Sequence, residues 1–474
     1  MPVDYTTEAR LAYLGWLENE ERAEEEHIRT LRDYLAGRQP VYLTDRQKEF
    51  IGLKAKNADY LYAHNLCSLI VDTATERLTV LGFESKNNGE SLAALAAAWW
   101  ERNRMDSVED KVYEAALGDG YSYIIVDNDG EGPRWTFNRR YDGTQGVKLH
   151  RDPSTDVPIF ASKRWQTYDM FDAKASARTR VTLYYRDRVE KYISAEPNDR
   201  PGPADNKIQD DNLRRKWHTI MDDGDDEWPI ALGIDDVPVF EFENPGGSEI
   251  EQVLSMQDTL NKSDLDLLGA ADNTGFQRTV LSGVMPEYED DGVTVRPIEL
   301  VPGGILSLTD PAASATTLPP GDLKPLIDTC DYYIRAIAGQ SRTPHYLLRG
   351  LGADQPSGES LRMQEIGMVD KCQRKQKIFG NVWEDIIYYS AKLMGMNAGN
   401  ARISTVWKEV GTRDELTVWQ VAQAKKAANI PDETIWAEAG YEQDEIDRMK
   451  EQRLAEQSLG SQLLKNFETA FGNA

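Results

Sequence analysis

The chain has 474 residues, 40% of them hydrophobic and 11 of them tryptophan, so it has enough apolar surface for roughly two to four compact regions and is not disordered throughout. Its formal net charge of −26 excludes a protein that holds nucleic acid through a broadly basic surface. The three cysteines, Cys67, Cys330 and Cys372, lie far apart in the sequence, form no disulfide framework or zinc pattern, and suit a reducing compartment.

The N-terminus and the hydropathy of the chain indicate a soluble, intracellular protein. Residues 1–5 lack the basic start and apolar core of a signal peptide. No apolar run approaches the roughly 18 residues of a transmembrane helix, and the longest candidate, residues 92–100, is a short alanine-rich helix face. We therefore expect no membrane partner.

The first half of the chain is predicted to be a body of grouped helices and strands. Four stretches carry apolar residues at helical spacing and are expected to be helices: 7–35, 65–77, 92–102 and 107–117. Six shorter stretches have the β-branched and aromatic content of strands: 78–83, 121–126, 159–161, 180–185, 189–193 and 237–242. Because helices and strands are grouped rather than alternating, the fold class is α+β with antiparallel pairing.

The pattern changes after the turn at residues 244–247. Residues 248–268 are predicted to be a helix, with Ser248 as its N-cap and Glu251 three residues on in a capping box. Residues 278–308 indicate short strands with turns, and residues 322–338 a returning helix. A helix, a small β module and a second helix thus form an excursion from the body.

A polar, glycine-rich loop over residues 349–358 leads to one very long amphipathic run, residues 360–393, which as a helix would span about 50 Å. Seven apolar residues are expected on its buried face: Ile366, Val369, Cys372, Phe379, Trp383, Ile386 and Leu393. Four cations lie in its middle: Lys371, Arg374, Lys375 and Lys377. These cations form either a solvated helix face or a contact with an acidic neighbour.

The C-terminal region is predicted to be helical, with helices over residues 413–429, 432–437 and 443–459 and turns between them. Residues 424–448 have the outline of a helix-turn-helix. The acidic residues there exclude major-groove reading, which requires Arg, Lys, Asn or Gln.

No recognisable catalytic, cofactor or metal motif occurs in the chain. The phosphate-binding loop of ATPases, the zinc motif H-E-x-x-H and the nucleophile motif G-x-S-x-G are absent, and the five histidines are isolated. One acidic cluster could hold a divalent cation, although it lacks the calcium-loop pattern and a solvated turn is the simpler interpretation: Asp222, Asp223, Asp225, Asp226 and Glu227. We therefore expect no enzyme and no cofactor, with a metal-dependent nuclease at this cluster as the alternative.

The order of these features resembles that of tailed-bacteriophage portal proteins, of the SPP1 Gp6-like type found in siphophages of Gram-positive hosts. The resemblance covers nearly the whole chain. It is carried by residues 337–348 before the polar loop, by the long helix after it, and by residues 427–434 and 440–446 near the C-terminus.

This resemblance implies a ring, usually of twelve subunits, at one capsid vertex, through which double-stranded DNA is packaged and later ejected. It implies the portal fold with these parts: a mixed α/β wing (1–244), a stem helix (245–276), a small β-containing clip (277–320), a second stem helix (321–345), a tunnel loop (346–359), a long wing helix (360–396) and an all-α crown with its tail (397–474). Family members carry no catalytic residues, because ATP hydrolysis belongs to the terminase.

The resemblance also assigns partners and site residues. The clip would meet the terminase large subunit and then head–tail connector proteins, while major capsid and scaffolding proteins would surround a ring assembled in the host cytoplasm and retained in the virion. The tunnel-loop residues expected to face DNA are Arg349, Gly350, Gly352, Asp354, Gln355, Ser357 and Gly358. The four cations of the long helix would contact an acidic neighbouring subunit. A minor capsid or connector protein is the structural alternative, and it would not need the excursion.

Overall fold

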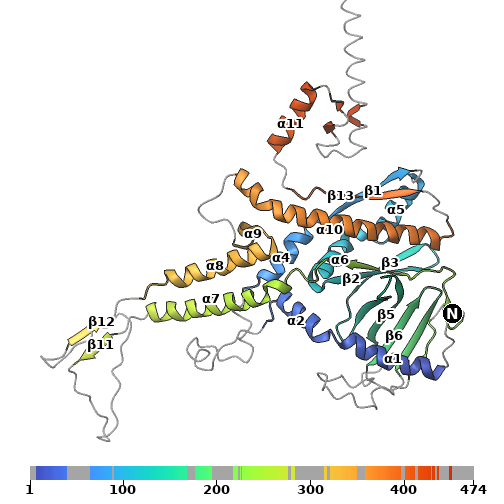
Figure 1. Cartoon of the computed structure of the whole chain (residues 1–474), viewed down its shortest axis with the longest axis horizontal. Helices are drawn as coiled ribbons and strands as arrows, with labels where there is room; N and C mark the ends of the chain where they lie inside the picture. The colour runs from blue at the N-terminus through green and yellow to red at the C-terminus, as the bar shows by residue number, and fades with distance from the viewer. Residues whose placement is uncertain are drawn as a thin grey trace, which may run out of the picture. The chain divides into compact units, whose positions relative to one another are not determined.

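In the computed structural model the chain forms two units, residues 1–410 and 411–474. The described residues are 7–39, 64–87, 90–167, 177–194, 217–222, 225, 227–275, 279–282, 314–317, 321–349, 358–396, 401–411, 415–428, 430–432, 435–436 and 448–450. Figure 1 draws the whole chain, coloured from the N-terminus to the C-terminus.

The N-terminal stretch forms two helices, α1 (Thr7–Arg22) and α2 (Glu25–Leu35), where the sequence predicts one. The chain leaves the helical conformation at Glu24, whose φ is −104° and ψ 2°. Tertiary ion pairs hold the residue at this break and the end of α1 before it, since Glu24 is paired with Arg140 and Glu21 with the buried Arg164. Periodicity alone carries no signal for such a break, because both helices keep their apolar spacing.

The strands of the first unit pair antiparallel throughout the described part, as expected for the α+β class. A three-stranded sheet has the order β10 (Val239–Glu243), β2 (Tyr121–Asn128), β3 (Pro133–Arg139). A six-stranded sheet contains β4 (Gly146–Arg151), β5 (Pro158–Thr167), β6 (Arg178–Tyr185), β7 (Arg188–Ser194) and β8 (Trp217–Thr219) in that order, with β9 (Ile230–Ala231) on β7. The predicted strands at 121–126, 159–161, 180–185, 189–193 and 237–242 all overlap these elements.

The main core lies where the long helix α10 (Gly358–Leu393) packs against the body. Three shorter helices contribute to this core: α4 (Leu66–Thr75), α5 (Glu90–Arg102) and α6 (Met105–Asp119). The indole of Trp383 is fully buried and makes edge-to-face contacts with Trp100 and Phe242. The predicted apolar face of α10 is wrong at Ile366, which is 50% exposed, while Cys372 and Phe379 are buried as expected.

The predicted excursion is present in the described residues as two long helices and a small hairpin. The 3-10 turn η3 (Glu251–Val253) leads into α7 (Leu254–Gly275), and α8 (Lys324–Ser341) returns beside it (Figure 1). Between them, β11 (Thr279–Ser282) pairs antiparallel with β12 (Ser314–Thr317). The predicted turns at residues 290–292 and 302–304 lie outside the described residues. After α8 the short helix α9 (His345–Arg349) precedes α10.

The predicted all-helical region from residue 397 begins instead with a strand. β13 (Arg402–Trp407) pairs antiparallel with β1 (Val80–Asn87), so residues up to Val410 belong to the first unit. This pairing joins segments more than 300 residues apart, which local sequence cannot report. In the second unit α11 (Glu415–Ala427) confirms the predicted helix at 413–429. Most of the predicted helix at 443–459 lies outside the described residues.

Candidate functional site

The candidate site lies where the excursion joins the body. Two of its residues, Ser248 and Glu249, are hydrogen-bonded to the end of α6. The Oγ of Ser248 donates to the carbonyl oxygen of Gly118 at 2.6 Å, and the backbone N–H of Glu249 donates to that of Leu117 at 2.9 Å. The left-handed Gly120, with φ of 85°, ends α6 and lies against the backbone of Gly247. The predicted capping box is therefore wrong: Ser248 bonds to α6, and α7 begins six residues later.

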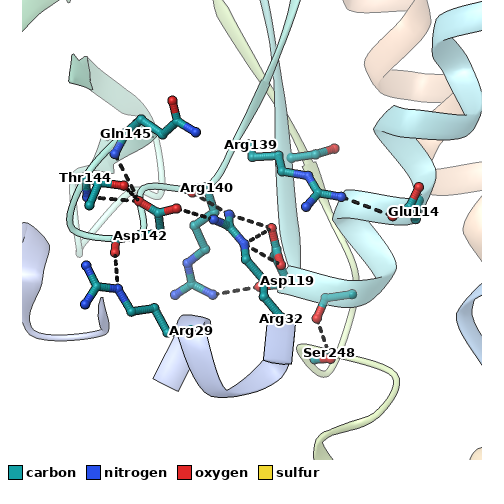
Figure 2. Close-up of polar contacts among 12 residues, drawn as sticks. Arg29, Arg32, Glu114, Asp119, Arg139, Arg140, Asp142, Thr144, Gln145 and Ser248 are labelled. Atoms are coloured by element: carbon teal, nitrogen blue, oxygen red, sulfur yellow. Dashed lines mark hydrogen bonds and ion pairs between the residues drawn. The ribbon is translucent and has the colours of Figure 1, made fainter. Parts of the chain in front are cut away.

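A network of ion pairs holds the same end of α6 to α2 and to the β3–β4 connection (Figure 2). The guanidinium of Arg32 donates to Asp119, with Nη2 at 2.8 Å from Oδ2, and to Asp142, with Nη1 at 2.5 Å from Oδ2. Burial opposes the charged form of Asp142, yet hydrogen bonds from Thr144 and Gln145 and the charge of Arg32 lower its pKa. Because Asp119 is almost fully buried, this network makes a rigid base for the junction.

Two of the four cations predicted on the long helix are bound within the chain. The Nζ of Lys371 donates to Oε2 of Glu249 at 2.9 Å and to the carbonyl oxygen of Ser341 at 2.8 Å. The Nζ of Lys375 donates to Oε1 of Glu249 at 2.5 Å and to Oδ1 of Asn244. The acidic group that these lysines meet is thus one of the chain's own carboxylates, 122 and 126 positions away in sequence.

The carboxyl group of Glu249 is strongly biased toward its charged form. Burial by itself would raise its pKa, but the charges of Lys371 and Lys375 and the hydrogen bonds that they donate lower the pKa to about 2. Lys375 is 3% exposed, so its ammonium depends on Glu249 and Asn244 for compensation. The ion pairs of Glu249 with Lys371 and Lys375 therefore connect the start of the excursion to the middle of α10.

The other two cations of the long helix remain exposed, and they differ in surroundings. Arg374 lines a polar cavity of about 490 Å³, whereas Lys377 lies outside it. The cavity is formed by the entry to α7, the end of α8 and one face of α10. Its lining residues are Pro245, Gly246, Gly247, Ser248, Glu249, Gln252, Gly339, Gln340, Ser341, Arg342, Lys371, Arg374 and Lys375.

The structure describes only the two ends of the predicted tunnel loop. Arg349 is the last residue of α9, and its guanidinium pairs with Asp331 of α8 at 3.0 Å. Gly358 is the first residue of α10. Gly350, Gly352, Asp354, Gln355 and Ser357 lie outside the described residues. The assignment of these seven residues to a DNA-facing loop stays a prediction.

The acidic cluster predicted as an alternative metal site is occupied by basic partners where it is described. Asp222 pairs with Arg180 at 2.5 Å and with Lys191 at 3.0 Å, and Asp225 pairs with the same lysine at 2.8 Å. Glu227 is exposed, and Asp223 and Asp226 lie outside the described residues. Within the described ranges no group of three or more His, Cys, Asp or Glu side chains is placed to hold a metal ion. Asp222 and Asp225 thus act as ion-pair partners.

Sequence reasoning missed three members of the site: Asn244, Glu249 and Arg342. The spacing of Lys371 and Lys375 places them on one helix face, which was a usable signal for a shared partner. The identity of that partner had no local signal.

None of the helices in the described part of the chain is long and apolar enough to cross a membrane.

Comparisons with known proteins agree on one family. The family model "Phage portal protein, SPP1 Gp6-like" matches residues 14–459. The portal protein of Mycobacterium phage L5 is 25% identical over 464 residues, covering 91% of this chain and 87% of the relative. That of Mycobacterium phage D29 is 24% identical over 454 residues, covering 89% and 86%.

Among solved structures, a chain from the neck of an empty gene transfer agent particle matches with a TM-score of 0.44 and 10% identity. That match covers 85% of this chain and 96% of the other. The family model extends over nearly the whole chain, from α1 to beyond α11. This chain belongs to the SPP1 Gp6-like family of phage portal proteins.

Proposed function

We propose that this protein is the subunit of a ring-shaped channel at one vertex of a phage capsid, through which double-stranded DNA enters and leaves. The observation that carries this proposal is the family match over residues 14–459. The paired helices α7 and α8 with the hairpin β11–β12 between them support it, since a channel subunit needs a projecting part that can meet other components. The family is structural, and the protein's role is mechanical rather than catalytic.

The parts of the chain have separate roles in this proposal. Residues 277–320 form the clip that docks the terminase large subunit during packaging and head–tail connector proteins afterwards. Residues 346–359 form the tunnel loop that faces DNA. Major capsid and scaffolding proteins contact the outside of a ring of twelve copies, which is assembled in the host cytoplasm.

The charge of the chain suits this role, because a channel must let DNA slide. Phosphate contacts from a basic surface would give strong sequence-independent binding, and a net charge of −26 avoids that. Fewer of the four cations on the long helix can take part in the proposed subunit contact, because two of them are already paired. Lys371 and Lys375 are paired within the chain, so the exposed Arg374 and Lys377 are the residues of this set available to a neighbour.

Native mass spectrometry and negative-stain images of the purified protein test the ring directly. We expect a mass of twelve chains and particles with a central hole. A species of one chain, or particles without a hole, would favour the minor capsid or connector alternative.

A loop exchange tests the DNA-facing role separately. Replacing residues 350–357 with glycine and serine is expected to change the packaged DNA length or its retention in filled particles. The matched control replaces residues 153–156, an exposed turn between β4 and β5, and should leave both unchanged. If the two exchanges behave alike, the tunnel-loop assignment is wrong.

A further inference from the structure

The cavity at the junction of α7, α8 and α10 is a concentration of positive charge in an acidic protein. Its lining includes four cations, Arg342, Lys371, Arg374 and Lys375, and one carboxylate, Glu249. The lining thus has a formal charge of +3, whereas the whole chain has −26. Such a charge imbalance in a concave, polar site favours an anion.

The two lysines and the two arginines have different surroundings in this cavity. Both oxygens of Glu249 accept from lysine, one from Lys371 and one from Lys375, so these three groups satisfy one another. Within the described residues neither the Arg342 nor the Arg374 guanidinium has a hydrogen-bond or ion-pair partner, and both residues are exposed. The guanidinium groups are therefore free to bind an oxyanion through paired N–H donors.

The backbone position of Arg342 is unusual for a residue with a side chain. It ends α8 with φ of 53°, in the left-handed region where glycine is preferred. A Cβ at Gly367 of α10 would lie 3.9 Å from the Cβ of Arg342, which places this arginine against α10 one turn before Lys371. Arg342 from α8 and Arg374 from α10 thus line one cavity from two different elements.

Part of the cavity wall is bare backbone. Gly246 and Gly247 have φ of 94° and 83°, conformations that glycine adopts readily. A Cβ at Gly246 or at Gly339 would meet no atom within 4 Å, so open space borders the main chain at both positions. The N–H of Gly247 donates to the carbonyl oxygen of Asn244 at 3.0 Å, so the bare main chain at Gly246 is what an oxyanion can approach beside the cationic side chains.

We propose that this cavity binds an oxyanion of the phosphate class between the guanidinium groups of Arg342 and Arg374. A tetrahedral oxyanion can contact two guanidinium groups on different elements and the glycine wall together, whereas a single carboxylate offers two oxygens in one plane and one charge. The same chemistry is available from free phosphate and from the phosphodiester of a nucleic acid. The inference is independent of the proposed channel.

Calorimetric titration of the full-length protein at constant ionic strength tests this site, with inorganic phosphate and a short blunt DNA duplex as separate probes. We expect each of R342A and R374A to weaken phosphate binding about ten-fold, the loss of one charged hydrogen-bonding group. R374K keeps the charge without the planar donor pair and should bind between the wild type and R374A. K392A is the matched control, an exposed cation on the same helix outside the cavity, and should bind as the wild type does.

Each outcome decides the proposal. Phosphate binding that is lost in the arginine variants supports the site. If the duplex then competes with phosphate, the source is a phosphodiester, and if it does not, the source is a free anion. Absence of phosphate binding, or equal binding by the R342A/R374A double variant with an unchanged circular dichroism spectrum, would overturn the proposal. If the wild type does not bind phosphate and the double variant has a changed oligomer mass, the cavity binds carboxylates of a second copy instead.

Discussion

The indole Nε1 of Trp383 donates a hydrogen bond to the hydroxyl oxygen of Tyr113 at 2.8 Å, and both side chains are fully buried. Tyr113 in turn donates to Oε2 of Glu109 at 3.2 Å, and the backbone N–H of Val80 donates to the same oxygen at 3.1 Å. This chain of hydrogen bonds links α10 to α6 and to β1. The position of the long helix in the body is therefore set by polar contacts as well as by apolar packing.

Replacing Trp383 with phenylalanine should destabilise the protein by about 2 kcal/mol, because the buried Tyr113 hydroxyl loses a donor and the smaller ring leaves space. Urea unfolding measures the change. W419F is the control, since that tryptophan is 51% exposed, and it should shift stability by less than about 0.5 kcal/mol. Equal effects of the two substitutions would contradict the buried hydrogen-bond chain.

The carboxyl group of Glu109 should make stability fall as pH rises. Burial raises its pKa from an ordinary 4.5 to about 7 in the folded protein, with Asp110 and Asp106 adding to the effect and the hydrogen bonds from Val80 and Tyr113 opposing it. Between these two values the folded state binds more protons than the unfolded state. The stabilising contribution of Glu109 is thus complete below about pH 4.5 and is lost as pH rises through about 7.

Comparing E109Q with the wild type isolates this contribution. The difference in unfolding free energy between the two proteins should change by roughly 3 kcal/mol from pH 4.5 to pH 7.5, because the pKa of Glu109 is about 7 when folded and 4.5 ordinarily. Urea unfolding at several pH values measures it. A wild type and E109Q with parallel pH profiles would show that Glu109 titrates normally.

Removing the Glu249 carboxylate should leave the buried Lys375 without its charged partner. E249Q is expected to cost about 3 kcal/mol, the range found when one member of a buried pair is lost. The double variant E249Q/K375M should recover part of this loss, because it removes the uncompensated charge as well. E251Q is the control: Glu251 is exposed and pairs with the exposed His27, so a change below about 0.5 kcal/mol is expected.

The contribution of Glu249 to the free energy of unfolding should also depend on pH. Its pKa of about 2 in the folded protein lies below its ordinary value of 4.5, so the unfolded state binds more protons between these values. The stabilisation is present above about pH 4.5 and is lost as pH falls toward 2. Acid unfolding of E249Q should therefore lack this component, and an identical acid profile for the two proteins would be inconsistent with the bridge.

The left-handed backbone conformation of Arg342 predicts that two substitutions there differ in stability but not in anion binding. R342G should be more stable than R342A by about 1 kcal/mol, because glycine adopts the left-handed conformation without strain and alanine does not. Both variants should lose the same phosphate affinity. Thermal unfolding with calorimetric titration measures the two quantities, and equal stabilities would contradict the strained helix end.

Much of the fold could be predicted from the sequence, because most elements carry their own periodic signal. The sequence predicts the long helix at 360–393, which is observed at Gly358–Leu393, and it predicts the order of α7, a β module and α8. Strand β11 lies in the predicted range of 278–308, whereas β12 lies beyond it. The failures have physical causes. Ser248 has the local signature of an N-cap, but its hydroxyl bonds instead to Gly118 of α6. The pairing of β13 with β1 joins segments that are distant in sequence.

The sequence by itself determined most of the secondary structure, the absence of a recognisable catalytic motif and the order of features that indicated the family. The tertiary structure decided which charges meet. Lys371 and Lys375 share a helix face at a spacing that the sequence shows, yet only folding brings Glu249 to them and leaves the Arg342 and Arg374 side chains without a partner among the described residues. Periodicity reports neighbours within one element, whereas charge pairing depends on distances between elements, which packing of the core fixes.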